Sequence, residues 1–93
     1  MSSWTFLTNH AQVLLAIAAD DRATAKEIAA VVGVTERAVQ RIIDDLVTEG
    51  YISRFREGRK NRYEIQVAQG LRHPAQRGCT IREFLLALAV EKD

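Results

Sequence analysis

Two short amphipathic segments meet at Gly33, and this junction constrains the fold more than any other feature of the chain. Thr24 and Glu27 form a capping box, the pattern that opens a helix. The apolar side of this helix continues to Val32, and the glycine that follows supplies the left-handed backbone that ends a helix sharply. A small residue, Ala29, allows a second helix to cross closely. We therefore expect two helices joined by a three-residue turn.

The second of these helices follows the turn at once. Thr35 is its natural N-cap, and Gly50 marks its end. Its apolar residues recur at spacings of three and four, as they do on one face of a helix. They are Val39, Ile42, Ile43, Leu46 and Val47. One side of this helix is therefore expected in the core, and the other side is free to face a partner.

A third helix is expected near the start of the chain, over His10–Ala19. Asn9 with Gln12 fits a capping box at its beginning. The residues expected on its apolar side are Ala11, Leu14, Leu15, Ala18 and Ala19. With the two helices that meet at Gly33, this segment would complete a three-helix core.

From Tyr51 onward, apolar and polar residues alternate, a pattern that predicts strands. Two alternating runs, 51–56 and 62–67, flank a polar connection at 57–61, so we expect a β-hairpin. Between Tyr51 and Tyr63, five residues are basic and only Glu57 is acidic, a net charge of +4 in a chain whose total is +1. The basic residues are Arg54, Arg56, Arg59, Lys60 and Arg62. Concentrated positive charge of this kind is typical of contact with phosphates.

The chain closes with another amphipathic helix, expected over 79–92 after a connecting loop at 69–78. A box formed by Thr80 and Glu83 opens it. Its apolar residues exceed what a three-helix core beneath a hairpin requires; they are Ile81, Phe84, Leu85 and Leu88. We expect them to form a two-fold homodimer, to which residues near the start could add: Trp4, Phe6 and Leu7. The alternative is a helix folded back on its own domain.

Composition excludes several classes of protein. With 93 residues, 47% of them apolar, the chain is expected to form one domain over 1–93. Its longest apolar runs are seven residues, against the roughly 20 that a membrane helix needs, and no secretory leader is visible, so we expect a cytoplasmic protein. A single Cys79 and two distant histidines, His10 and His73, offer no internal disulfide and no metal-ligand spacing. No catalytic set can be assembled, so we expect no enzyme, no metal and no cofactor.

The order of helix, helix, turn, helix and hairpin resembles the winged helix-turn-helix of bacterial and archaeal transcription regulators of the MarR and ArsR type. The resemblance covers about 9–67, and its most specific parts are Val34–Arg41 and Leu46–Ile52. It implies a mainly α fold with a small β-hairpin, in which a three-helix core plus wing forms a DNA-reading head at 9–67 and an additional C-terminal helix follows. Metal sensors of the ArsR type carry paired cysteines near the third helix. This chain has none there, so metal sensing is disfavoured.

By this resemblance the third helix would enter the major groove of double-stranded DNA. Arg37 or Arg41 could pair with guanine and Gln40 with adenine. Glu36 could accept from cytosine, and Thr35 could hold a phosphate. In winged-helix relatives the hairpin tip lies along the backbone or enters the minor groove. The hairpin residues expected at DNA are Arg54, Arg56, Arg59, Lys60, Asn61 and Arg62.

Other interpretations remain open at this point. Arg41 could pair with Asp45 one turn later, and acids outnumber bases over 36–49, which gives a net charge of −2. Basic residues on the hairpin could serve only to prevent aggregation of sheet edges. The same surface could bind an acidic protein instead of DNA. A small-molecule effector would need a pocket between the head and the last helix, and its identity is unknown.

Overall fold

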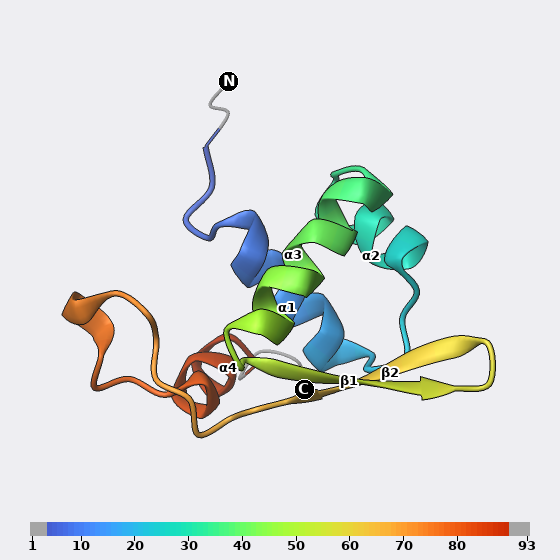
Figure 1. Cartoon of the computed structure of the whole chain (residues 1–93). Helices are drawn as coiled ribbons and strands as arrows, with labels where there is room; N and C mark the ends of the chain where they lie inside the picture. The colour runs from blue at the N-terminus through green and yellow to red at the C-terminus, as the bar shows by residue number, and fades with distance from the viewer. Residues whose placement is uncertain (1–3, 90–93) are drawn as a thin grey trace.

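The structure, a computed structural model, describes residues 4–89. Three helices form the core, a two-stranded antiparallel hairpin follows, and a fourth helix closes the chain (Figure 1). The elements are α1 (Asn9–Ala19), α2 (Ala25–Val32), α3 (Glu36–Thr48), β1 (Ile52–Glu57), β2 (Lys60–Ile65), the 3-10 turn η1 (Pro74–Gln76) and α4 (Ile81–Ala89). This is a winged helix-turn-helix with an additional C-terminal helix, as expected. Position 90 and those after it, which the expected last helix included, lie outside the described residues.

Threonine side chains begin the three core helices. The hydroxyl oxygens of Thr8, Thr24 and Thr35 each accept a hydrogen bond from the backbone N–H three residues later, at 3.0–3.1 Å. The prediction that Asn9 caps α1 is wrong. Thr8 has the extended backbone of an N-cap, whereas Asn9 is already the first residue of the helix.

The turn between α2 and α3 has the predicted form. Gly33 adopts the left-handed conformation, with φ of 87°, and its N–H donates to Ala29 O at 2.8 Å. The N–H of Val34 donates to the same carbonyl at 3.2 Å, so the last turn of α2 is closed by two hydrogen bonds. This geometry sets the crossing of α2 and α3.

The buried side of α1 differs in part from the predicted one. Val13, Leu14 and Ile17 are buried in the core, while Ala18 and Ala19 are exposed. The segment is apolar on nearly every side, so its periodicity defines no single face. The larger Val13 and Ile17 remove more apolar surface from water than alanines do, and the helix is turned accordingly.

The turn of the hairpin is tighter than predicted. Glu57 is paired with Lys60, so the connection is two residues instead of five, with Gly58 at φ of 63° in its first position, which is typical of a type II′ turn. The N–H of Tyr63 donates to Asp21 O at 3.0 Å, so the connection between α1 and α2 lies beside β2. The hairpin then projects beyond the helices (Figure 1).

Helix α4 packs on the core formed by the first three helices and the hairpin. Ile81 is only 2% exposed and belongs to the core, and Phe84 and Leu85 pack partly against it. The backbone of Gln69 and Val67 accepts hydrogen bonds from the first turn of this helix, at 2.8 and 2.9 Å. The expectation that Ile81 lies at a dimer interface is therefore corrected, because its side chain is already buried within its own domain. Every described helix is too short to cross a membrane.

Candidate nucleic-acid interface

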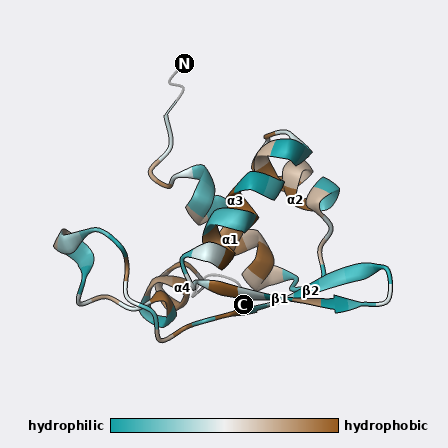
Figure 2. Ribbon diagram, in the orientation of Figure 1, coloured by the Kyte–Doolittle hydropathy of each residue, from teal (hydrophilic) through white to brown (hydrophobic). Residues whose placement is uncertain are grey.

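The exposed face of α3 carries the residues predicted to read bases. Arg37, Gln40 and Arg41 are exposed and lie three and four positions apart, so they share one face of the helix. Glu36 is exposed in the first turn. Thr35 uses its hydroxyl oxygen to cap α3, which leaves the hydroxyl hydrogen free to donate to a phosphate. Hydrophilic residues continue along α3 and most of the hairpin (Figure 2).

Acidic residues in the second half of α3 and at its C-cap are paired with basic residues from other parts of the chain. The paired atoms are Asp44 Oδ1 with Arg54 Nη1 at 3.2 Å, Asp45 Oδ2 with His10 Nε2 at 2.8 Å, and Glu49 Oε1 with Arg72 Nη2 at 4.0 Å. The alternative pair of Arg41 with Asp45 is thus not formed. Within residues 4–89, neither Arg37 nor Arg41 has an acidic partner within 4.0 Å. The acids that give this helix its net negative charge therefore leave the guanidinium groups of Arg37 and Arg41 without a partner among the described residues.

The hairpin residues predicted at DNA are divided between two faces of the sheet. Arg54, Arg56 and Asn61 share the face of the buried Tyr63, which is turned toward the helices. Arg62 lies on the opposite face, across from Phe55. Its guanidinium carbon is 4.7 Å from the centre of the Phe55 ring, and its nitrogens bind Glu57 and Glu64.

The wing tip, defined as Gly58, Arg59 and Lys60, holds the two cations of the hairpin that make neither an ion pair nor a side-chain hydrogen bond within the described residues. Arg54 is paired with Asp44, and Arg56 donates to Gly58 O at 2.9 Å. In the described part of the chain, no acid lies within 4.0 Å of Arg59 or Lys60. Both side chains are exposed and available to an external anion.

A hollow of about 420 Å³ connects α3 to the wing tip. Its lining includes Gln40, Asp44, Arg54, Arg59, Lys60 and Asn61. Two further lining residues, Arg22 and Thr24, come from the connection that precedes α2 and were not predicted. No periodicity or motif marks Arg22, which lies in the polar connection after α1. Predicted residues from two separate elements thus border one concave surface.

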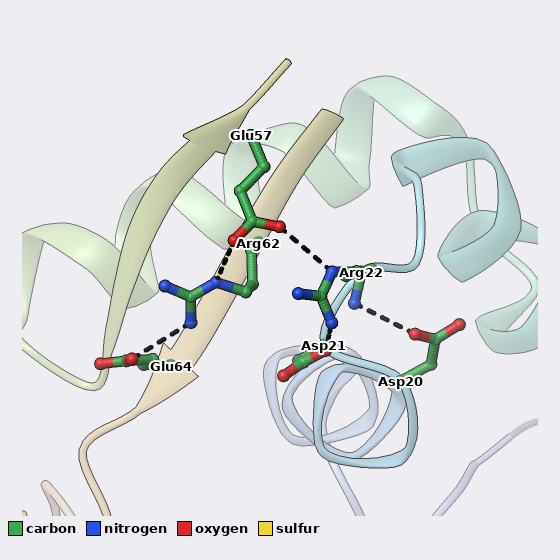
Figure 3. A network of polar contacts seen from close by, with 6 residues as sticks. All are labelled: Asp20, Asp21, Arg22, Glu57, Arg62 and Glu64. Atoms are coloured by element: carbon green, nitrogen blue, oxygen red, sulfur yellow. Dashed lines mark hydrogen bonds and ion pairs between the residues drawn. The ribbon is translucent and has the colours of Figure 1, made fainter. Parts of the chain in front are cut away.

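An ion-pair network covers the outer face of the hairpin (Figure 3). Glu57 lies between Arg62 and Arg22, with Nε atoms 2.8 Å and 3.2 Å from its two carboxylate oxygens. The hydrogen bond from Arg62, with a smaller effect from Arg22, holds the pKa of the Glu57 carboxyl below its ordinary value of 4.5. Hydrogen bonds to Glu64 and Glu57 raise the pKa of Arg62. Glu57 and Arg62 are therefore both charged at neutral pH.

Acid is expected to remove the stabilising effect of Glu57. Because its pKa is lowered in the folded state, its contribution is present above 4.5 and is lost as the pH falls through the lowered pKa. The thermal midpoint of the wild type should exceed that of Glu57→Gln by a small, constant amount near neutral pH, and the two should converge in acid. Thermal unfolding followed by circular dichroism tests this. A gap unchanged down to about pH 2 would contradict it.

A second hollow, of about 490 Å³, lies between the reading head and α4. Its lining is mainly apolar and includes Leu14, Leu46, Tyr51, Leu71, Ile81 and Phe84. Phe6 and Leu7, which precede α1, border it as well. The space that an effector would require is therefore present between these two parts. Among residues 4–89, no three His, Cys, Asp or Glu side chains are grouped to hold a metal ion.

Helix, turn, helix and a basic hairpin around one hollow define the winged-helix class of DNA-binding proteins. Within this class, the model of the MarR family matches residues 5–62. Because the match covers more than half of the chain, the protein belongs to the MarR family, and membership implies DNA-binding transcriptional regulation rather than enzymatic activity. The resemblance to ArsR regulators is not confirmed, and the alternative of a protein-interaction module gains no support. No curated protein matches the chain.

Proposed function

We propose that this protein binds double-stranded DNA sequence-specifically as a homodimeric transcription regulator, with α3 in the major groove and the wing tip on the backbone or in the minor groove. The observation that carries this proposal is the presence of unpaired cations on both α3 and the wing tip. Arg37 and Arg41 lie on α3 and Arg59 and Lys60 at the wing tip, and none has an acidic partner among the described residues. Gln40 of α3 borders the same hollow as Arg59 and Lys60.

Base reading is assigned to the first half of α3. Arginine forms two hydrogen bonds with guanine, and glutamine does so with adenine. Arg37, Gln40 and Arg41 are exposed on one face and free to do this. Phosphate contact is assigned to Arg59, Lys60 and the hydroxyl of Thr35. Arg54 and Arg56 are already bound within the chain, so we assign them to support of the wing and to weaker phosphate contacts.

The Arg37→Ala variant tests base reading. It is expected to relax the preference at one base pair, by about 1–3 kcal/mol of discrimination, because a guanine would lose its bidentate partner. Arg82→Ala is the matched control, since it removes an exposed arginine from α4, away from the reading helix. Selection from random duplexes with both variants measures the effect. Unchanged base preference in Arg37→Ala would remove the assignment.

The dimer is assigned to α4 and the segment ahead of α1. Leu86 and Leu88, on different sides of α4, are 64% and 43% exposed, and Phe6 is 92% exposed, with its ring centre 5.1 Å from that of Trp4. A two-fold dimer would cover apolar surface that the single domain leaves in water. Phe84 and Leu85, half-buried, would support the interface from beneath. The dimer would place the two copies of α3 about 34 Å apart on a near-palindromic DNA site.

Sedimentation tests the dimer. The wild type is expected to be a dimer at micromolar concentration, and Leu86→Glu with Leu88→Glu is expected to be a monomer that binds DNA more weakly. Val31→Glu, which changes an exposed valine on α2, is the control and should remain dimeric. A wild-type monomer at these concentrations would contradict the assignment.

A further inference from the structure

The carboxylate of Glu57 joins two parts of the molecule that lie far apart in the sequence. One oxygen is bound by Arg62 on β2, and the other by Arg22, which precedes α2 (Figure 3). Arg22 is itself held in place, because its N–H donates to Asp20 Oδ1 at 3.0 Å and its guanidinium lies 3.7 Å from Asp21. We call Arg22, Glu57 and Arg62 the clasp.

The clasp lies where the hairpin has no other packing on its outer face. Glu57 is the last residue of β1 and directly precedes the wing tip. Over 54–60 every side chain is exposed, and the nearest buried side chain of the hairpin is that of Tyr63, opposite Arg54 on the inner face. An isolated two-stranded hairpin is marginal in water. On the inner face, Arg54 binds Asp44, which leaves the outer face to the clasp.

We infer that Glu57 is a positioning residue for DNA binding: through Arg22 it fixes the direction of the wing, so that Arg59 and Lys60 reach phosphates while α3 lies in the groove. This inference rests on the function proposed above. Glu57 itself contacts no DNA. Its effect passes through the two cations that follow it in the turn.

Charge repulsion alone predicts the opposite effect of Glu57 on the affinity for DNA. An acidic side chain beside a DNA surface repels phosphates, so neutralising Glu57 should raise affinity. Exposed ion pairs also contribute little to the stability of a fold. A positioning role predicts that the same change lowers affinity, because freeing the wing adds an ordering cost to binding and weakens both phosphate contacts. The sign of the effect therefore separates the two explanations.

The experiment compares Glu57→Gln with Glu64→Gln in the full chain. Both remove one negative charge from the same face of the hairpin, but only Glu57 binds Arg22. Binding to a random-sequence duplex is followed by fluorescence anisotropy at several salt concentrations. Glu57→Gln is expected to bind about three- to tenfold more weakly at about 100 mM salt, with a shallower salt dependence, while Glu64→Gln binds equally or more tightly.

A second comparison shows whether Glu57 acts through the wing tip. In a protein that already carries Arg59→Gln and Lys60→Gln, adding Glu57→Gln should cause no further loss of affinity. Glu57→Asp keeps the charge but shortens the side chain, and it should weaken binding as Glu57→Gln does. Circular dichroism confirms that each variant is folded before it is compared.

Several outcomes would overturn the inference. Tighter binding by Glu57→Gln, or an equal loss with and without the wing-tip cations, would show that Glu57 does not position the wing. In those cases the wild type still binds duplex DNA and the proposed function stands. If the wild type shows no salt-dependent binding to duplex DNA, the proposed function and this inference both fail.

Discussion

Replacing Arg59 and Lys60 together by glutamine is expected to lower affinity for duplex DNA about 50-fold at about 100 mM salt. Each phosphate contact releases close to one counterion, so two lost contacts should also reduce the slope of log affinity against log salt by about 1.8. Both side chains are exposed and lack acidic partners in the described part of the chain, so their charge is available to phosphates.

The control for this variant removes the same charge elsewhere. Arg77→Gln with Arg82→Gln takes two exposed arginines from the loop before α4 and from α4 itself, at the opposite end of the molecule from the wing tip (Figure 1). It is expected to change the affinity by less than about threefold, because exposed charges at the other end of the molecule are screened by salt. Equal losses in the two variants would mean that net charge alone attracts DNA.

Ile28→Ala is expected to destabilise the fold by about 2–5 kcal/mol. Ile28 is 1% exposed on the inner side of α2, so its removal leaves a cavity in the core beneath the turn at Gly33. A domain of this size has a total stability near the lower end of about 5–15 kcal/mol, so the substitution should remove a substantial share of it and lower the midpoint of unfolding. Urea unfolding followed by circular dichroism measures the loss.

The matched control lies on the same helix. Val31 is 77% exposed, so Val31→Ala removes little buried surface and should change the free energy of unfolding by no more than about 0.5 kcal/mol. The two variants are compared at one protein concentration, since a dimer would make stability concentration-dependent. Equal effects of the two substitutions would contradict the observed orientation of α2.

The helices could be predicted because their signals are local. The boxes at Thr24 and Thr80 and the cap at Thr35 satisfy backbone groups within four residues, and a left-handed glycine at position 33 ends α2. The predicted start of α1 was wrong because two adjacent residues, Thr8 and Asn9, are both of a type that favours the N-cap. Only the backbone conformation distinguishes them.

The register of the two strands decides which face of the hairpin each side chain occupies, and the predicted and observed registers differ by one residue. A five-residue connection would place Arg56 opposite Arg62, with both on one face. The observed two-residue turn places Phe55 opposite Arg62 instead. Since neighbouring strand residues point to opposite faces, a shift of one residue moves a side chain across the sheet. The sequence pattern therefore located the basic hairpin but not the side on which Arg62 lies.

The ionic partners of the site could not be predicted from spacing. His10 binds Asp45, and Arg22 binds Glu57, each across 35 positions of the chain. Such pairs arise only when the helices and the hairpin are packed together. Neither His10 nor Arg22 was among the residues predicted for the site. His10 binds an acid on the exposed surface of α3, and Arg22 holds the wing.

Sequence-specific binding to duplex DNA is tested most directly by selection from random duplexes, followed by titration of the wild type with the enriched and a scrambled duplex. We expect an enriched, near-palindromic site that binds at least about 1,000-fold more tightly than the scrambled one, with affinity for both falling steeply between about 50 and about 200 mM salt. Recovery of no enriched sequence, together with affinity that is independent of salt, would contradict the proposed function.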